Sequence, residues 1–174
     1  PGLGSGQADT HDEAVSLTHQ SVKAAPDTQP FLNALQDDVF AIMPTHATCN
    51  EFGSMPITQS KKAVDFLRKQ KNDALLITDD FCMAGAYAGT TQEKAIKQAL
   101  SVGYDLVIFS GKPAEQIAVI NALQNVPTVP NKKARHLPTI MPKFTQPINE
   151  AALANQLACS YLQTFAIQPI NNSP

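Results

Sequence analysis

Two adjacent carboxylates stand at the end of a short apolar run in the middle of the chain. Ala74 to Ile77 is unbroken in its apolar character, and Thr78, Asp79 and Asp80 follow at once. A run without alternation is typical of a strand buried on both faces of a parallel sheet. The carboxyl ends of such strands carry the chemistry of parallel α/β folds, where a carboxylate acts as nucleophile, metal ligand or general base. The structural alternative is that Asp80 bonds nearby backbone while Asp79 pairs with a cation.

A second candidate group lies near the start of the chain, in the segment Asp9, Thr10, His11. The i, i+2 spacing places Asp9 and His11 on one side of an extended loop, where a carboxylate can orient an imidazole. An oriented histidine with a pKa near neutrality is the usual proton shuttle. The alternative is a helix start, with Asp9 or Thr10 as the cap and the acidic residues Asp12 and Glu13 in the first turn.

Three further side chains lie beside these groups in the sequence. His46 ends an expected strand, so it shares the edge of the sheet with Asp79 if both strands belong to one sheet, and it then lines a pocket or serves as a structural histidine. Cys82 and Met83 follow the acidic pair. A cysteine nucleophile needs a nearby histidine or a helix start, so we interpret Cys82 as a small packing residue.

The elements that must position these residues alternate along the chain. Strands are expected at Val39–Met43, Leu75–Thr78 and Leu106–Phe109, and residues 48–56 are expected to be loop. The spacing of apolar residues and cap signals predicts helices over Val15–Ala25, from Thr28 or Gln29 through Leu35, from Thr58 or Ser60 through Leu67, from Thr90 or Thr91 through Leu100 with Gly103 as the stop, over Ala114–Leu123 and over Glu150–Phe165. Strict alternation of buried strands and helices predicts an α/β fold with a parallel sheet.

Composition narrows the class of protein. The chain has 174 residues with 43% hydrophobic and 16% charged residues, which is typical of one globular domain. A formal net charge of −2 favours neither nucleic acid nor an anionic membrane surface, and no apolar run approaches the roughly 20 residues of a membrane span. Cys49, Cys82 and Cys159 are odd in number and lack C-x-x-C spacing, which argues against a disulfide framework or a zinc site and for a reducing compartment.

Four segments taken together resemble glycoside hydrolase family 3, most closely its bacterial β-N-acetylhexosaminidases of the peptidoglycan-recycling type. They are P-G-L-G-S-G-Q-A-D-T-H-D-E (residues 1–13), A-I-M-P-T-H-A (41–47), L-I-T-D-D-F-C-M-A-G-A (76–86) and Y-D-L-V-I-F-S (104–110). The resemblance covers roughly residues 1–123. It implies a (β/α)₈ TIM barrel that releases non-reducing terminal β-linked N-acetylglucosamine with retention of configuration, from peptidoglycan fragments (muropeptides) in the cytoplasm, without a cofactor or metal.

The resemblance also implies roles for individual residues. Asp79 would be the nucleophile that forms the glycosyl-enzyme intermediate, and His11 the general acid and base, oriented by Asp9. Most retaining glycosidases use two carboxylates, so a histidine–aspartate pair is this subfamily's departure. His46 and Met83 would lie near the sugar pocket, and Asp80 would support the site by hydrogen bonds. The loop that carries His11 is expected to swing over bound substrate.

Two departures from the family pattern set the expected domain organisation. The family has Lys-His-Phe directly before the Pro-Gly that opens this chain, and a complete barrel needs about 250 residues. We therefore expect residues 1–125 to be the C-terminal half of a barrel, structured only beside an N-terminal half supplied by a separate segment or chain. Residues 126–174 fall outside the family pattern and are expected to be a Pro-rich extension followed by a helix that packs on the barrel.

Two other functions stay open on the residues alone. A flavodoxin-like phosphoacceptor receiver also has alternating strands and helices, an acidic pair at a strand end, and a lysine (here Lys112) after a later strand. A barrel relic that binds sugar without catalysis is the second. Hydrolysis that depends on Asp79, phosphoryl labelling of Asp79, and binding without turnover would distinguish the three.

Overall fold

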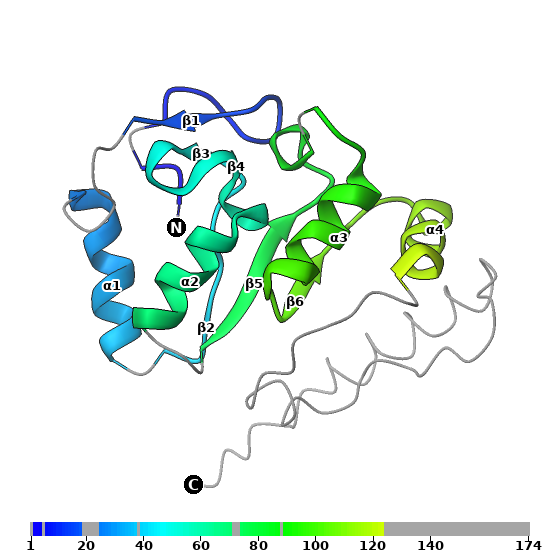
Figure 1. Cartoon of the computed structure of the whole chain (residues 1–174). Helices are drawn as coiled ribbons and strands as arrows, with labels where there is room; N and C mark the ends of the chain where they lie inside the picture. The colour runs from blue at the N-terminus through cyan, green and yellow to red at the C-terminus, as the bar shows by residue number, and fades with distance from the viewer. Residues whose placement is uncertain are drawn as a thin grey trace, which may run out of the picture.

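The computed structural model describes residues 2–4, 6–18, 25–37, 39–70, 74–87 and 89–123. Its centre is a parallel sheet in the order β2-β5-β6, formed by β2 (Ala41–Ile42), β5 (Leu75–Asp80) and β6 (Leu106–Ile108) (Figure 1). The chain enters each strand of this sheet after a helix, as the alternation predicts. The expected C-terminal arm and helix, residues 126–174, lie outside the described residues.

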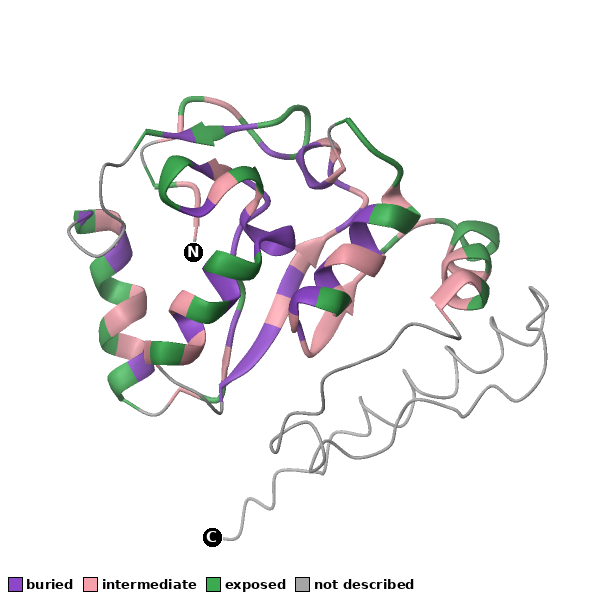
Figure 2. Cartoon of the chain, in the orientation of Figure 1, coloured by how far each residue is buried: buried purple, intermediate pink, exposed green. Residues whose placement is uncertain are grey.

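Within the described residues, four helices accompany the parallel sheet: α1 (Gln29–Gln36), α2 (Lys61–Gln70), α3 (Gln92–Val102) and α4 (Pro113–Leu123). The main apolar core joins Leu35 of α1, Val64 of α2 and Ile96 of α3 to Leu76 on β5. Val64 and Ile96 are buried. Figure 2 shows that α2 and α3 each have buried residues on one side and exposed residues on another. Truncating a fully buried residue such as Leu76 to alanine would cost about 2–5 kcal/mol, so this packing fixes β5 against its helices.

Two helix ends follow the signals in the sequence. Thr91 caps α3, because its side chain accepts a hydrogen bond from the backbone N–H of Lys94 at 3.3 Å. Gly103 ends the same helix in the left-handed region, with φ of 111°, where its N–H bonds back to the carbonyl of Leu100. At α2, Ser60 takes the capping position through Ala63, whose N–H donates to the Ser60 hydroxyl at 3.4 Å.

A second small sheet was not predicted from the sequence. It has the order β1-β3-β4, formed by β1 (Ser16–Leu17), β3 (Thr48–Cys49) and β4 (Gly53–Pro56); β1 is parallel to β3 and β4 is antiparallel to it. The expectation of a loop over residues 48–56 is therefore wrong.

The predicted helix over Val15–Ala25 is also wrong at its start, where β1 lies. Val15 and Leu17 are buried and Ser16 is exposed, which is the two-residue period of a strand. Pairing with β3 overrides the helical potential: the N–H of Thr48 donates to the carbonyl of Val15 at 2.8 Å, and the hydroxyls of Ser16 and Thr48 lie 2.9 Å apart.

Short 3₁₀ turns connect the strands and helices: η1 (Pro26–Thr28), η2 (Asn50–Phe52), η3 (Ile57–Gln59) and η4 (Ala84–Ala86). The strand predicted at Val39–Met43 is shorter than expected, whereas β5 continues through Asp80. Asp79 and Asp80 are thus the last two residues of the central strand, and their side chains point to opposite sides of it.

Candidate active site

A pocket of about 320 Å³ opens at the end of the strand that carries Asp79. Its walls come from three parts of the chain that are distant in sequence: the loop at the start, the segment after β2, and the end of β5. The lining residues are Gly2, Leu3, Asp9, Thr10, His11, Met43, Pro44, Thr45, Asp79 and Met83. The structure therefore brings Asp79, Asp9, His11 and Met83 together, as the order of motifs suggests, whereas His46 is not among the lining residues.

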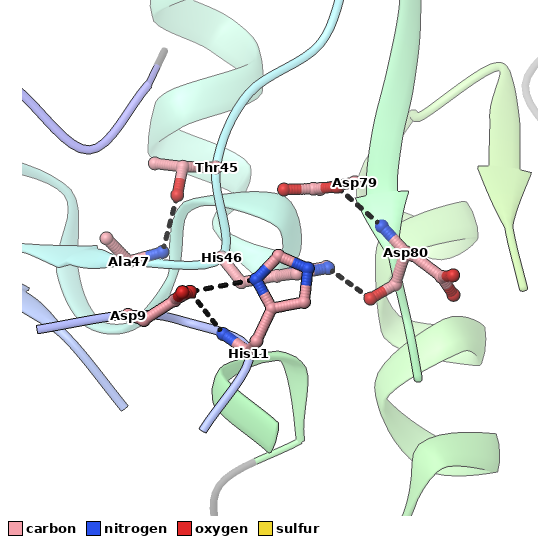
Figure 3. A network of polar contacts seen from close by, with 7 residues as sticks. All are labelled: Asp9, His11, Thr45, His46, Ala47, Asp79 and Asp80. Atoms are coloured by element: carbon pink, nitrogen blue, oxygen red, sulfur yellow. Dashed lines mark hydrogen bonds and ion pairs between the residues drawn. The ribbon is translucent and has the colours of Figure 1, made fainter. Parts of the chain in front are cut away.

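Asp79 projects toward the pocket with one carboxylate oxygen engaged. Its Oδ1 accepts a hydrogen bond from the backbone N–H of Asp80 at 2.9 Å, which restricts the rotation of the carboxylate (Figure 3). The side chain is half-buried. A carboxylate in this setting can approach an electrophilic carbon in the pocket without first leaving a salt bridge.

Asp9 and His11 form a pair at the mouth of the pocket. Oδ1 of Asp9 accepts hydrogen bonds from both the backbone N–H and the ring Nδ1 of His11, at 2.9 and 2.8 Å (Figure 3). Since the carboxylate only accepts, Nδ1 carries a proton, and Nε2 is the ring nitrogen available to exchange a proton with a bound molecule. The residues form a turn and no helix begins here, so the cap alternative is not what the structure shows.

The contact between Asp9 and His11 shifts the pKa values of the two side chains in opposite directions. The hydrogen bond from the His11 backbone, followed by that from its ring, holds the pKa of Asp9 below its usual range. The hydrogen bond and then the charge of Asp9 raise the pKa of His11, and the charge of Asp79 adds to the same effect. His11 thus keeps a proton to a higher pH than an isolated histidine, which suits a group that must first donate one.

Asp80 turns away from the pocket and joins the ends of β5 and β6. Its carboxylate accepts from the backbone N–H of Cys82 at 2.9 Å, from the backbone N–H of Ser110 at 3.1 Å, and from the Ser110 hydroxyl. Burial raises the pKa of Asp80, but these hydrogen bonds outweigh it and the pKa lies below the ordinary value. The two adjacent carboxylates therefore have different surroundings, and Asp80 has the supporting position expected for it.

His46 lies behind the pocket wall, with 1% of its surface exposed. Its Nε2 donates to the backbone carbonyl of Asp80 at 3.0 Å (Figure 3). Its Nδ1 lies 2.7 Å from the hydroxyl of Thr58. A carbonyl only accepts, so Nε2 carries the proton and Nδ1 accepts from Thr58. Burial lowers the pKa of His46, in keeping with this neutral ring. The contact links the segment after β2 to the backbone next to Asp79.

Sequence reasoning missed part of the pocket wall. Met43, Pro44 and Thr45 follow β2 directly and line the pocket. The strand-end rule that selected Asp79 applies equally to them, so their place after a buried strand was the available signal. Cys82 does not line the pocket, and burial raises the pKa of its thiol, which does not favour an activated nucleophile.

Neither a metal site nor a membrane-spanning helix is found within the part of the chain that the structure describes. In that part, no group of three or more histidine, cysteine, aspartate or glutamate side chains is placed to hold a metal ion. Nor do the helices described there include one with the length and apolar character that crossing a membrane requires.

The chain is similar to known proteins over most of its length. Residues 1–137 match the N-terminal domain of glycosyl hydrolase family 3. The β-hexosaminidase of Hydrogenovibrio crunogenus is 31% identical over 125 residues, which are 70% of this chain and 35% of that protein. The β-hexosaminidase of Haemophilus influenzae is 31% identical over 140 residues, 78% of this chain and 40% of that protein.

Solved structures share the fold. A β-N-acetylhexosaminidase from Beutenbergia cavernae has a TM-score of 0.63 at 23% identity, covering 94% of this chain and 44% of that one. NagZ from Neisseria gonorrhoeae, solved in complex with N-trifluoroacetyl-D-glucosamine, has a TM-score of 0.59 at 16% identity, covering 93% of this chain and 48% of that one.

The chain thus spans less than half the length of the relatives described above. The match is to a glycosidase domain, which contradicts the alternative of a flavodoxin-like receiver. The chain belongs to glycosyl hydrolase family 3, through the family's N-terminal domain.

Proposed function

We propose that this chain carries the catalytic residues of a retaining β-N-acetylhexosaminidase that releases terminal N-acetylglucosamine from peptidoglycan fragments. The observation that carries the proposal is the shared pocket, where the Asp79 carboxylate and the Asp9–His11 pair lie on the walls of one cavity. The relatives named β-hexosaminidase supply the sugar class. The apolar side chains of Met43 and Met83 offer a surface for the less polar face of a sugar ring.

The first chemical step forms a bond between Asp79 and the sugar. The Asp79 carboxylate attacks the anomeric carbon, the bond from that carbon to the leaving oxygen breaks, and Nε2–H of His11 protonates that oxygen. Asp9 keeps Nδ1 hydrogen-bonded, so the ring presents Nε2 throughout and the positive charge of protonated His11 is stabilised.

The second step releases the sugar with its original configuration. Nε2 of His11, now neutral, accepts a proton from water, and the oxygen of that water attacks the anomeric carbon as the Asp79 carboxylate departs. His11 returns to its protonated form. One residue serves as acid and then as base, which a pKa near the working pH allows.

The test uses a 4-nitrophenyl β-N-acetylglucosaminide and the chain combined with an N-terminal half-barrel, a combination called the assembled barrel below. Asp79→Asn should abolish turnover, and His11→Ala should lower it by about 10²–10⁴-fold, since that is the range for general acid–base catalysis. Asp37→Asn is the matched control, because Asp37 is an exposed aspartate outside the pocket lining. Turnover unchanged by Asp79→Asn would contradict the proposal, and sugar binding without turnover would favour the non-catalytic relic.

We also propose that an N-terminal half-barrel completes the fold. The chain covers 35% and 40% of two curated relatives, and Ile77, Leu106 and Ile108 of the parallel sheet are only half-buried in the described structure. Open strand edges and apolar faces favour association. Size-exclusion chromatography and urea unfolding test this: the chain alone should self-associate or unfold without cooperativity, whereas a stable, cooperatively unfolding monomer would refute the idea.

A further inference from the structure

The loop that bears Asp9 and His11 is tied to the segment that follows Asp79. The N–H of Gly85 donates to the carbonyl of Thr10 at 2.9 Å, and the N–H of Ala84 donates to the carbonyl of His11 at 3.1 Å. Both donors belong to η4, more than seventy residues further along the chain. These two hydrogen bonds hold the backbone of His11 itself, not a distant part of its loop.

Position 85 requires glycine because there is no room for a side chain at this contact. Its φ lies outside the left-handed region, so the backbone conformation does not demand glycine. A Cβ at this position, however, would lie 2.9 Å from the carbonyl oxygen of Glu13 and 3.0 Å from that of Thr10. Any side chain at position 85 would therefore push the loop away from η4.

Thr10 anchors the loop from its other side. It is 1% exposed, while the side chains of Asp9 and His11 on either side of it are 59% and 70% exposed. The turn is closed by hydrogen bonds from the N–H groups of Asp12 and Glu13 to the carbonyl of Asp9. With Thr10 buried and the backbone bonded to η4, the loop has a defined seat in the conformation described here, and its swing over bound substrate stays a prediction.

The seat is continuous with the end of β5. The N–H of Met83 donates to the carbonyl of Asp80 at 3.1 Å, and the N–H of Ala86 donates to the carbonyl of Met83 at 3.0 Å. The side-chain amide of Gln59 donates to the carbonyl of Ala86 at 2.5 Å. η4 is therefore fixed to the strand that presents Asp79 and to the body of the molecule.

We propose that the contact of Ala84 and Gly85 with the carbonyls of Thr10 and His11 is a latch that sets the position of His11 relative to Asp79. Gly85 is then a positioning residue for the acid/base. The catalytic meaning of the latch rests on the proposed function, but the latch itself does not. Its geometry can be measured whether or not the protein hydrolyses a sugar.

The first test measures how strongly His11 senses Asp79. The pKa of His11 is determined by NMR in the assembled barrel with and without Asp79→Asn, in the parent protein and in latch variants. In the parent, Asp79→Asn should shift the pKa of His11 downward, because a neighbouring negative charge is removed. In Gly85→Ala the downward shift should be smaller, since the loop has moved away.

A second variant guards against misfolding of Gly85→Ala. Ala84→Pro removes the N–H that donates to His11 and keeps glycine at position 85. Position 84 opens η4, and Met83 before it has φ of −71° and ψ of 136°, a conformation that suits the residue before proline. The proposal is overturned if the effect of Asp79→Asn is the same in the parent and in both variants, or absent from the parent.

The kinetic test separates positioning from general damage. Both latch variants should lose on the order of 10–100-fold in kcat/KM toward a substrate with a poor leaving group, because misplacement of a catalytic group by about 1 Å has such effects. With a good leaving group such as 4-nitrophenolate, attack on the bond between Asp79 and the sugar limits turnover. Azide, which replaces water in that second step without needing a base, should therefore accelerate both latch variants and His11→Ala. Gly53→Ala is the matched control: it strains a backbone with φ of 104° and meets nothing within 4 Å, so azide should leave it unaffected.

The outcomes distinguish the two proposals. A parent that lacks turnover contradicts the proposed function, while the NMR comparison still decides the latch. Latch variants that turn over like the parent, or that respond to azide no more than Gly53→Ala does, contradict the positioning role of Gly85.

Discussion

The ion pair between Arg68 and Asp105 joins the N-terminal ends of β5 and β6. The loss of unfolding free energy when the pair is removed tests how much this junction stabilises the fold. The side chain of Asp105 is 2% exposed; its Oδ2 accepts from Nη2 of Arg68 at 2.7 Å and from the backbone N–H of Leu76 at 2.8 Å. The backbone N–H of Asp105 donates in return to the carbonyl of Leu76 at 2.9 Å. The change Asp105→Ala therefore removes a buried charge from the junction of the two strands.

The expected cost is about 3 kcal/mol of unfolding free energy. Removing one partner of a buried ion pair costs about 3–5 kcal/mol, because the other charge is left without compensation. Arg68 is one-fifth exposed and keeps the carbonyls of Ala74 and Gly103 as acceptors, which places the cost at the lower end of that range. The stranded N–H of Leu76 accounts for about 1–3 kcal/mol of it.

The measurement is urea unfolding of the assembled barrel, together with hydrogen exchange at the Leu76 amide. Asp65→Ala is the control, because Asp65 pairs with Lys61 on the surface of α2 with 53% of its side chain exposed, and should cost no more than about 0.5 kcal/mol. Asp105→Asn keeps an acceptor for Leu76 and should fall between the two. The reasoning from burial is refuted if Asp105→Ala costs no more than Asp65→Ala.

Three further outcomes are expected. In NMR titrations, His11 should take up its proton above pH 6.5 and His46 only below pH 6.5, and titration of both at the same pH would contradict the assigned surroundings. Acidification below pH 6.5 should therefore favour unfolding through His46, because the unfolded state binds that proton more readily. The stabilising contribution of His11 is present below pH 6.5 and is lost as the pH rises through its raised folded-state pKa. Thr91→Ala should lower the free energy of unfolding in urea by about 1 kcal/mol, because the α3 cap is lost. Thr90→Ala is the control, because Thr90 is exposed and is not the cap, so this change should leave the free energy of unfolding unchanged. Gly103→Ala should cost about 1–2 kcal/mol in the same assay, because φ of 111° strains any residue with a Cβ.

Local signals in the sequence were sufficient for the central part of the fold. The apolar run before Asp79 predicts β5, and Thr91 and Gly103 mark the two ends of α3 where the structure has them. These features are encoded within a few residues, through burial on both faces, a capping hydroxyl and a left-handed glycine. The i, i+2 spacing of Asp9 and His11 likewise predicts that the two side chains lie on one side of the loop, where they are hydrogen-bonded, although the backbone is a turn and not extended.

Contacts between distant segments could not be predicted in the same way. Val15 and Leu17 form a strand only because β3 offers a parallel partner, a pairing that no local pattern specifies. The position of His46 behind the wall depends on Thr58 and the carbonyl of Asp80. The sequence alone indicates only a loop glycine at position 85, because the close approach of the Thr10 carbonyl depends on the fold.

The alternation of exposed Asp9, buried Thr10 and exposed His11 limits how the length of this loop can vary. Surface loops usually accept insertions and deletions, because their residues have no fixed partners. Here a single deletion within Asp9–His11 exchanges inward and outward positions and turns the imidazole into the protein. Natural or engineered length variation should therefore be excluded from Asp9, Thr10 and His11.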